Sequence, residues 1–273
     1  MKKGFSLTEL IIYMLMSMIM LGIITVVFVS VSDSYKKTMS TFDVQREVEA
    51  AADQIRRDLN QSSLNSIVVY PSGSERNPGV SMISPCQEET FSKTTTSDSF
   101  VMTQNGGPRW GRYVFYTVLP RETKSGEQGS QYQGRMGNLV RWVWELDDKD
   151  ISPYPSPTNV LPSQFSTKRA PFSIILRGVP LPTSPELQGL PHFKTNGVDY
   201  GGFQVAFVRQ SCDKTGKVTS EYLTGVNPSK AVSPTDTGNV SELVQVNITN
   251  IYISELSGKL SAYSFSFTSY PKN

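Results

Sequence analysis

The amino-acid sequence predicts an α+β protein in which a long N-terminal α-helix, membrane-spanning in its first half, packs on a β-rich globular head. Three observations support this fold class. A run without any charged residue extends from Leu10 to Ser32 and consists mostly of Ile, Leu, Met and Val. A stripe of apolar residues at helical spacing follows it. The rest of the 273 residues is a series of short segments rich in Val, Ile, Phe, Tyr and Trp, separated by turn-forming stretches.

The uncharged run is the first element. As a helix rising 1.5 Å per residue it reaches roughly 34 Å, which is enough to cross the hydrocarbon core of a bilayer. A secretory signal peptide is one alternative, but its apolar region is shorter, and no Ala-x-Ala site follows the run. An ordinary signal anchor is a second alternative, and the length of the uncharged run agrees with it. Neither alternative accounts for Glu9, because a charge in such a segment is costly and usually has a partner or a function.

The helix is expected to continue beyond the membrane. Five apolar residues recur at the spacing of one helical face: Val44, Val48, Ala51, Ile55 and Leu59. The residues between them are predicted to form a solvated face: Gln45, Arg46, Glu47, Glu49, Asp53, Arg56 and Asp58. No Pro or Gly occurs from Ser32 to Ser66, so residues 5–61 are predicted to form one helix of roughly 85 Å. Residues 5–32 are its membrane half, and residues 33–61 are an amphipathic continuation that packs on the head.

Residues 62–273 are predicted to form the β-rich head, as one domain or as two small sheets. The candidate strands, each bounded by turn-forming residues, are Ile67–Tyr70, Ser99–Gln104, Tyr113–Leu119, Leu139–Leu146, Phe172–Leu176, Phe203–Arg209, Val218–Leu223, Leu243–Ile253 and Lys259–Thr268. Residues 140–144 and 262–267 alternate between large apolar and smaller or polar side chains. Residues 213–217 are predicted as a hairpin turn. Stretches rich in Pro, Gly or Ser are predicted as surface loops over residues 71–99, 121–137, 151–171 and 179–191.

No residue pattern points to an enzyme. His192 is the only histidine, so a catalytic triad or a His-based metal cluster has no second member. Cys86 and Cys212 are the only cysteines; outside the cytoplasm they can form a disulfide, and the alternative is two independent thiols. Residues 147–150 (Asp-Asp-Lys-Asp) offer carboxylates for calcium, but they lack the EF-hand spacing, and a solvated acidic turn is favoured. We therefore expect no catalytic residue, no metal and no cofactor.

The N-terminal residues resemble the processing site of type IV prepilins and pseudopilins. Lys2-Lys3-Gly4 is followed by Phe5-Ser6-Leu7-Thr8-Glu9 and then by the uncharged run. The resemblance implies that residues 1–4 are a leader, that a membrane-embedded prepilin peptidase cuts between Gly4 and Phe5, and that the new amino terminus of Phe5 is methylated. It also implies a partner for Glu9. That carboxylate can pair with the amino terminus of Phe5 on a neighbouring subunit, so that two costly charges neutralise each other in lipid.

The same resemblance implies a location and partners. It implies a single-pass protein of the inner (cytoplasmic) membrane with a periplasmic or extracytoplasmic head, assembled into a filament or its tip. Its partners are then other major and minor pilins or pseudopilins, the prepilin peptidase and the inner-membrane assembly platform. Lys36 and Lys37 follow the apolar run closely enough to contact lipid headgroups.

Charge argues against a nucleic-acid partner. The chain carries 26 Lys+Arg and 24 Asp+Glu, a formal charge of +2. Removal of Lys2 and Lys3 with the leader leaves equal numbers, so the mature chain is formally neutral. Binding to nucleic acid depends on a basic patch or stripe, and the dense basic candidates in the chain are only the short pairs Lys36-Lys37, Arg56-Arg57 and Lys168-Arg169.

The head carries a second resemblance. Residues 51–59, 112–116, 137–142 and 203–207, followed by the turn at Asp213, occur in an order similar to that of J-type minor pseudopilins of type II secretion and W-type minor pilins of type IV pili. This resemblance implies a minor subunit that primes or caps assembly of the filament. The alternatives are a tip subunit for adhesion or DNA uptake, an abundant major pilin, which the large head disfavours, and an unrelated membrane-anchored enzyme.

Overall fold

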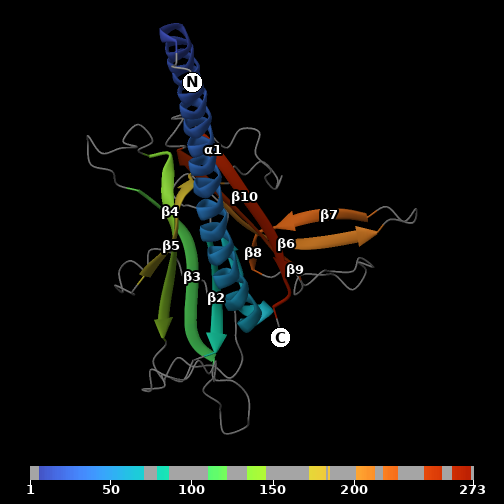
Figure 1. Ribbon diagram of the computed structural model, residues 1–273. Helices are drawn as coiled ribbons and strands as arrows, with labels where there is room; N and C mark the ends of the chain where they lie inside the picture. The colour runs from blue at the N-terminus through green and yellow to red at the C-terminus, as the bar shows by residue number, and fades with distance from the viewer. Residues whose placement is uncertain are drawn as a thin grey trace.

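The computed structural model describes residues 6–70, 79–85, 110–121, 134–145, 172–182, 184, 201–212, 218–226, 243–253 and 260–271. Its longest element is α1 (Leu7–Gln61), a single uninterrupted α-helix, as the sequence predicted. Figure 1 shows the second half of α1 lying across the β-sheets, while the first half projects beyond them. The helix ends at Ser62, whose backbone N–H donates to the carbonyl groups of Asp58 and Leu59. A short 3-10 helix, η1 (Leu64–Ser66), follows.

The described strands form two antiparallel sheets, which confirms the α+β fold class. The first sheet has the order β5-β4-β3-β2-β1-β8 and the second has the order β10-β9-β6-β7. The strands of the first sheet are β1 (Val68–Tyr70), β2 (Gly79–Pro85), β3 (Trp110–Pro120), β4 (Met136–Glu145), β5 (Phe172–Pro180) and β8 (Gly225–Val226). Those of the second are β6 (Phe203–Cys212), β7 (Val218–Leu223), β9 (Leu243–Ile253) and β10 (Leu260–Ser269).

Each predicted strand is present where the structure describes its residues, and Ser99–Gln104 lies outside them. The hairpin between β6 and β7 is also confirmed by the pairing of Cys212 with Val218, although the predicted turn at residues 213–217 lies outside the described residues. The strand β5 extends to Pro180, four residues beyond the predicted end, so the loop predicted from residue 179 begins later.

The strand β2 was not predicted. It lies within residues 71–99, which were predicted as a loop, and it pairs with β1 and β3 inside the first sheet. Its buried Val80 and Met82 have the period of two that a strand requires. The loop prediction was wrong here because serines and the terminal Gly79 and Pro85 make the segment resemble a connection. The two-residue β8 was also missed, because it is too short to show a period.

The main core lies between α1 and the two sheets. Val48, Ala51, Ile55 and Leu59 are buried there and Val44 is partly buried, which confirms the predicted helical stripe. The aromatic residues of β10 pack against the same core from one face of their strand, as the alternation predicted: Tyr263, Phe265 and Phe267. The second half of the helix is therefore part of the head and not an appendage to it.

A smaller core occupies the other face of the first sheet. Phe115 on β3 and Trp142 on β4 stack there with their ring centroids 5.8 Å apart. Because side chains alternate along a strand, Tyr116 and Arg141 point to the opposite face, toward α1. The first sheet thus has an inner face that packs on the helix and an outer face with its own apolar cluster.

The two sheets meet where β5 passes β9. Asn250 Nδ2 donates a hydrogen bond of 2.9 Å to the backbone carbonyl oxygen of Arg177. The next residue, Gly178, has φ of 75°, and a Cβ atom there would lie 2.7 Å from the carbonyl oxygen of Ile251. Glycine is needed at this position both for its backbone conformation and for the close approach of the two strands.

Candidate functional site

The first turn of α1 contains Glu9, which is the only residue of the predicted processing and assembly motif (Gly4, Phe5 and Glu9) that the structure describes. Ser6 is the N-cap, and its Oγ accepts a hydrogen bond of 3.3 Å from the backbone N–H of Thr8. In return, the backbone N–H of Ser6 donates to Glu9 Oε2 at 3.1 Å. These reciprocal bonds form a capping box, and the helix dipole also favours a carboxylate in the first turn. Gly4 and Phe5, the predicted cleavage and methylation site, precede the described residues.

Glu9 therefore has a local structural role that the sequence analysis missed. The Ser-x-x-Glu spacing from Ser6 to Glu9 is the signal that could have predicted it. The capping bond involves only Oε2, and an ionised carboxylate has about four acceptor positions over its two oxygens. The geometry at Glu9 thus leaves acceptor capacity for a second donor.

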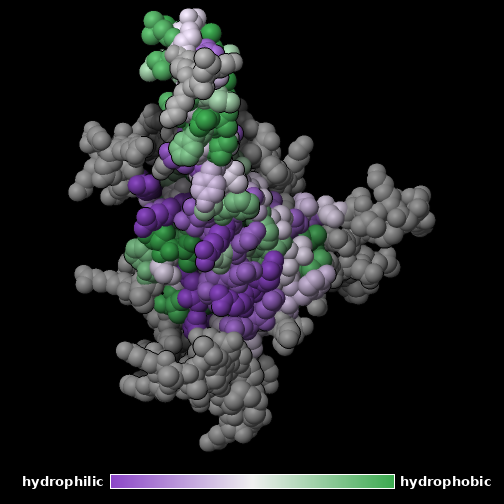
Figure 2. Space-filling model, viewed as in Figure 1, coloured by the Kyte–Doolittle hydropathy of each residue, from purple (hydrophilic) through white to green (hydrophobic). Residues whose placement is uncertain are grey.

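The first half of α1 exposes its apolar side chains. Large apolar residues from Leu7 to Val31 are exposed, and none of the most apolar stretch is buried inside the molecule. In length and composition this helix could cross a membrane, and an N-terminal signal sequence passes the same test. Figure 2 shows hydrophobic colour over the projecting end of α1 and hydrophilic colour over much of the head below it.

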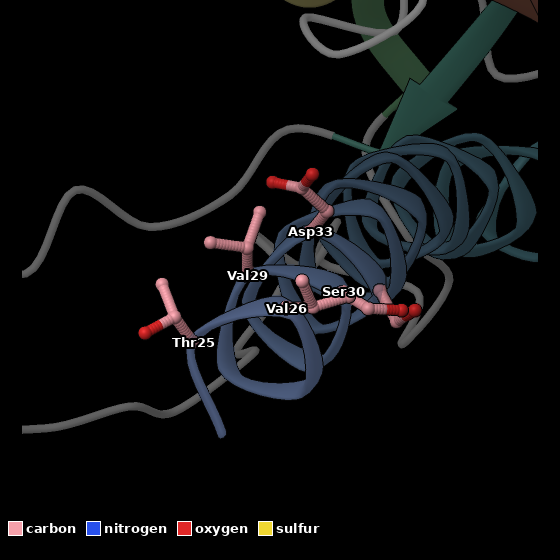
Figure 3. A pocket seen from close by; sticks show the side chains of 6 residues that line it. Thr25, Val26, Val29, Ser30 and Asp33 are labelled. Atoms are coloured by element: carbon pink, nitrogen blue, oxygen red, sulfur yellow. The ribbon is translucent and has the colours of Figure 1, made fainter. Parts of the chain in front are cut away.

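A concavity of about 560 Å³ lies along α1 where the apolar run ends (Figure 3). The described residues that line it are Thr25, Val26, Val29, Ser30, Asp33 and Ser34. The hydroxyl of Thr25 donates to the carbonyl oxygen of Leu21, one helical turn earlier, at 2.8 Å. All of these residues belong to one helix, and no other described element brings a functional group toward them, so we assign no ligand to this concavity.

A buried ionic cluster joins the last turn of α1 to the first sheet. Asp58 is 3% exposed. The guanidinium of Arg141 on β4 donates to both of its oxygens, from Nε to Oδ2 at 2.7 Å and from an Nη nitrogen to Oδ1 at 3.2 Å. The hydroxyl of Tyr116 on β3 also donates to Oδ2. The prediction that Asp58 lies on the solvated face was wrong, because it follows Ile55 by three residues and so shares the buried stripe.

Burial and charge set the titration of this cluster. Burial raises the pKa of the Tyr116 hydroxyl well above its ordinary value, and the neighbouring negative charge of Asp58 raises it further. Burial alone would lower the pKa of the Arg141 guanidinium, but its hydrogen bonds to Asp58 and the charge of Asp58 outweigh burial and raise it. The cluster is thus a neutral tyrosine beside a closed ion pair. It fastens α1 to β3 and β4.

The exposed side of the helix behaves as predicted at Asp53. Its Oδ1 accepts a hydrogen bond of 3.1 Å from Arg56, one turn further along α1. The guanidinium of Arg56 also lies 4.8 Å from the ring centroid of Phe267 on β10. The helix therefore contacts the second sheet through a cation–π interaction as well as through its apolar stripe.

The other predicted residues cannot be placed in a site. Cys86 lies outside the described residues, and Cys212 is described only through its backbone at the end of β6. The disulfide between them stays a prediction. His192 and the acidic residues 147–150 also lie outside the described residues. Within the described ranges, no group of three or more His, Cys, Asp or Glu residues is arranged to hold a metal ion.

Comparisons with known proteins add no relative. No protein-family model, no curated protein and no solved structure matches this chain.

Proposed function

We propose that this chain is a minor subunit of a type IV pilus or of a type II secretion pseudopilus, which primes or caps assembly of the filament. The observation that carries the proposal is the motif Gly4-Phe5 followed by Glu9, placed directly before an exposed apolar half-helix. The same helix continues into the core of a β-rich head without a break. This architecture suits a subunit that is stored in a membrane and then transferred into a filament.

The physical role of Glu9 follows from the environment of the apolar half-helix. Lipid tails are as apolar as the side chains of a neighbouring helix, so transfer from the bilayer to a filament gains little from the hydrophobic effect. A polar pair changes this balance, since a carboxylate in lipid is costly until it meets a cation. The amino terminus of a neighbouring Phe5 supplies that cation once the leader has been removed. The role of the chain is then structural, and cleavage makes it competent for assembly.

The buried cluster supports the same role. Force or displacement acting on the membrane half of α1 reaches the head through its second half. The ion pair between Asp58 and Arg141 fixes the end of this half to the first sheet, and the apolar stripe fixes the rest. The subunit can therefore move as one unit when it leaves the membrane.

Mass spectrometry of the mature N-terminus tests the proposal. The full-length chain is expressed together with a prepilin peptidase and purified from membranes. We expect a chain that begins with N-methylated Phe5, whereas Gly4→Val should retain Lys2 and Lys3, because a side chain at this position obstructs the peptidase. Gly22→Ala is the matched control, since the structure has open space around Gly22. A mature chain that keeps Met1, or one that is cut after the apolar run, would rule the proposal out.

A further inference from the structure

The outer face of the first sheet has a hollow of about 480 Å³ at the end of β3, β4 and β5. The described residues that line it are Leu119, Pro120, Arg121, Asn138, Val140, Phe172, Ile174 and Arg177. Val140 precedes Arg141, which points inward to Asp58, so Val140 and Asn138 belong to the opposite face. The hollow therefore lies on the side of the sheet that α1 does not cover.

The hollow has an apolar floor at the end of the sheet. Val140 is buried in it, whereas Phe172 and Ile174 on β5 are 54% and 45% exposed. Val140 pairs with Ile174 across the strands, and Trp142 pairs with Phe172, whose ring makes an edge contact with the indole at 5.9 Å between centroids. Exposed large apolar side chains that are held in register on a sheet are typical of a contact surface.

Polar groups border this floor. Arg121 and Arg177 are both exposed, and within the described part of the chain neither side chain has an ion pair or hydrogen bond. Asn138 lies between Leu119 and Arg177 in the strand register. Its side-chain oxygen is buried and has no hydrogen-bond partner among the described residues. A buried carbonyl oxygen without a donor costs free energy, and this one lies beneath the surface of the hollow, so the two arginines are the polar groups that a ligand can reach.

We propose that this hollow binds an extended acidic peptide segment of a partner protein. Carboxylates of the segment pair with Arg121 and Arg177, because guanidinium groups bind carboxylates with two parallel hydrogen bonds. An apolar side chain of the segment covers Phe172 and Ile174, and the backbone of the segment lies along the edge of β5. The proposal stands independently of the filament role.

The position of β5 favours a peptide over a free anion. The strand is at the end of its sheet, and its only strand partner in that sheet among the described residues is β4. Its exposed residues, Phe172 to Ile174, lie before the two register shifts that interrupt the pairing. An extended chain can approach such an edge and offer N–H groups and apolar side chains together. A free phosphate offers neither an N–H donor nor an apolar group.

Fluorescence anisotropy on the full-length chain in detergent tests the proposal. The probe is a fluorescein-labelled peptide that alternates glutamate with isoleucine. Three matched peptides replace its glutamates by glutamine, its glutamates by lysine, or its isoleucines by serine. We expect the glutamate–isoleucine peptide to bind at least about tenfold more tightly than each of the others, since it alone supplies both the charge and the apolar contact.

Variants of the chain locate the binding. Arg121→Gln and Arg177→Gln should each weaken the binding of the glutamate–isoleucine peptide by about five- to tenfold. Arg46→Gln is the matched control, because it removes an exposed arginine from α1 on the other side of the sheet, and it should leave the affinity unchanged. Equal binding of the glutamine peptide, full competition by an equal concentration of inorganic phosphate, or an equal effect of the control variant would each overturn the proposal.

Discussion

Asp58 shows, at the scale of one residue, how this head accepts a buried charge. A carboxylate that is 3% exposed loses its water and needs partners in return. Arg141 supplies a positive charge and two hydrogen bonds, and Tyr116 supplies a third. Replacement of Asp58 or Arg141 would leave a buried charge without its partner, which costs more than the intact pair contributes. The cluster therefore specifies how the last turn of α1 sits on the sheet.

The raised pKa of Tyr116 predicts a loss of stability at alkaline pH. Below pH 10 the tyrosine is protonated in both the folded and unfolded chains. As the pH rises further, Tyr116 ionises in the unfolded chain but not in the folded chain, so the free energy of unfolding falls by about 1.4 kcal/mol per pH unit from this residue. Tyr116→Phe should remove that part of the slope and should cost about 2 kcal/mol at neutral pH, because the hydrogen bond that it loses is to the charged Asp58.

Urea unfolding followed by tryptophan fluorescence between pH 8 and pH 11 would measure this slope. Tyr270→Phe is the matched control, since Tyr270 is exposed and its replacement should leave the slope as in the wild type. Identical slopes for wild type and Tyr116→Phe above pH 10 would contradict the assigned pKa direction.

Glu9 has two roles that a pair of substitutions can separate. Glutamine keeps a hydrogen-bond acceptor at the third position of the capping box but removes the charge. If Glu9 pairs with a neighbouring amino terminus, both Glu9→Gln and Glu9→Val should still be inserted, cut after Gly4 and folded, but neither should co-purify with partner pilins. The expected loss is several-fold or more in recovered partner, because a lone buried charge costs a few kcal/mol.

Co-purification from membranes at equal expression distinguishes the roles of Glu9. Thr8→Ala serves as the matched control, since only the backbone N–H of Thr8 joins the capping box. Wild-type recovery with Glu9→Gln and loss with Glu9→Val would assign Glu9 to the helix cap alone.

At the scale of elements, periodicity predicted what local patterns can encode. The stripe from Val44 to Leu59 predicted the buried face of α1, and the alternation in β10 predicted its core-facing aromatic residues. The strand β2 was missed because Ile83 follows Met82 directly and obscures the period of Val80 and Met82, and the other residues of the strand are small or turn-forming. Its central place depends on pairing with β1 and β3, from which residues 71–78 and 86–109 separate it. Such pairing leaves no local signal.

The junction between the sheets depends on a backbone contact that predicts a stability difference between two glycine variants. Gly178 and Gly134 have nearly the same φ, 75° and 77°, but Gly134 has open space where a Cβ would be placed. Gly134→Ala should therefore cost about 1–2 kcal/mol for the backbone conformation alone. Gly178→Ala should cost about 1–3 kcal/mol more than Gly134→Ala, because its Cβ meets the Ile251 carbonyl oxygen and pushes β5 away from β9.

Thermal unfolding of the two glycine variants, measured side by side, separates the cost of the close approach of β5 to β9 from the cost of the positive φ, and Gly178→Ala should have the lower melting temperature. Equal melting temperatures would show that β5 and β9 do not depend on glycine for their contact.

At the scale of the whole molecule, the sequence predicted that α1 is divided into a membrane half and a head half, because the uncharged run ends before Asp33 and the apolar stripe begins at Val44. It predicted less of the candidate site. The Glu9 motif was recognised from adjacent residues, whereas the partners of Asp58 lie on two strands far along the chain. The hollow on the outer face likewise combines residues from three strands whose register only the folded structure supplies.

The same division predicts the outcome of two truncations. Removal of residues 1–32 takes away the exposed apolar half of α1 and leaves the stripe from Val44 to Leu59 in the core. The remaining chain should be water-soluble without detergent and should unfold cooperatively. Removal of residues 1–61 deletes the stripe and also leaves Arg141 and Tyr116 without Asp58, so the two sheets lose the helix that packs against both of them. That chain should aggregate or lack a cooperative transition.

Size-exclusion chromatography and near-ultraviolet circular dichroism would compare the two truncated chains. A folded, monomeric chain after the longer truncation would mean that the head does not need α1 for its stability. If the chain without residues 1–32 folds and the chain without residues 1–61 does not, the boundary between the two halves of the molecule lies inside the helix.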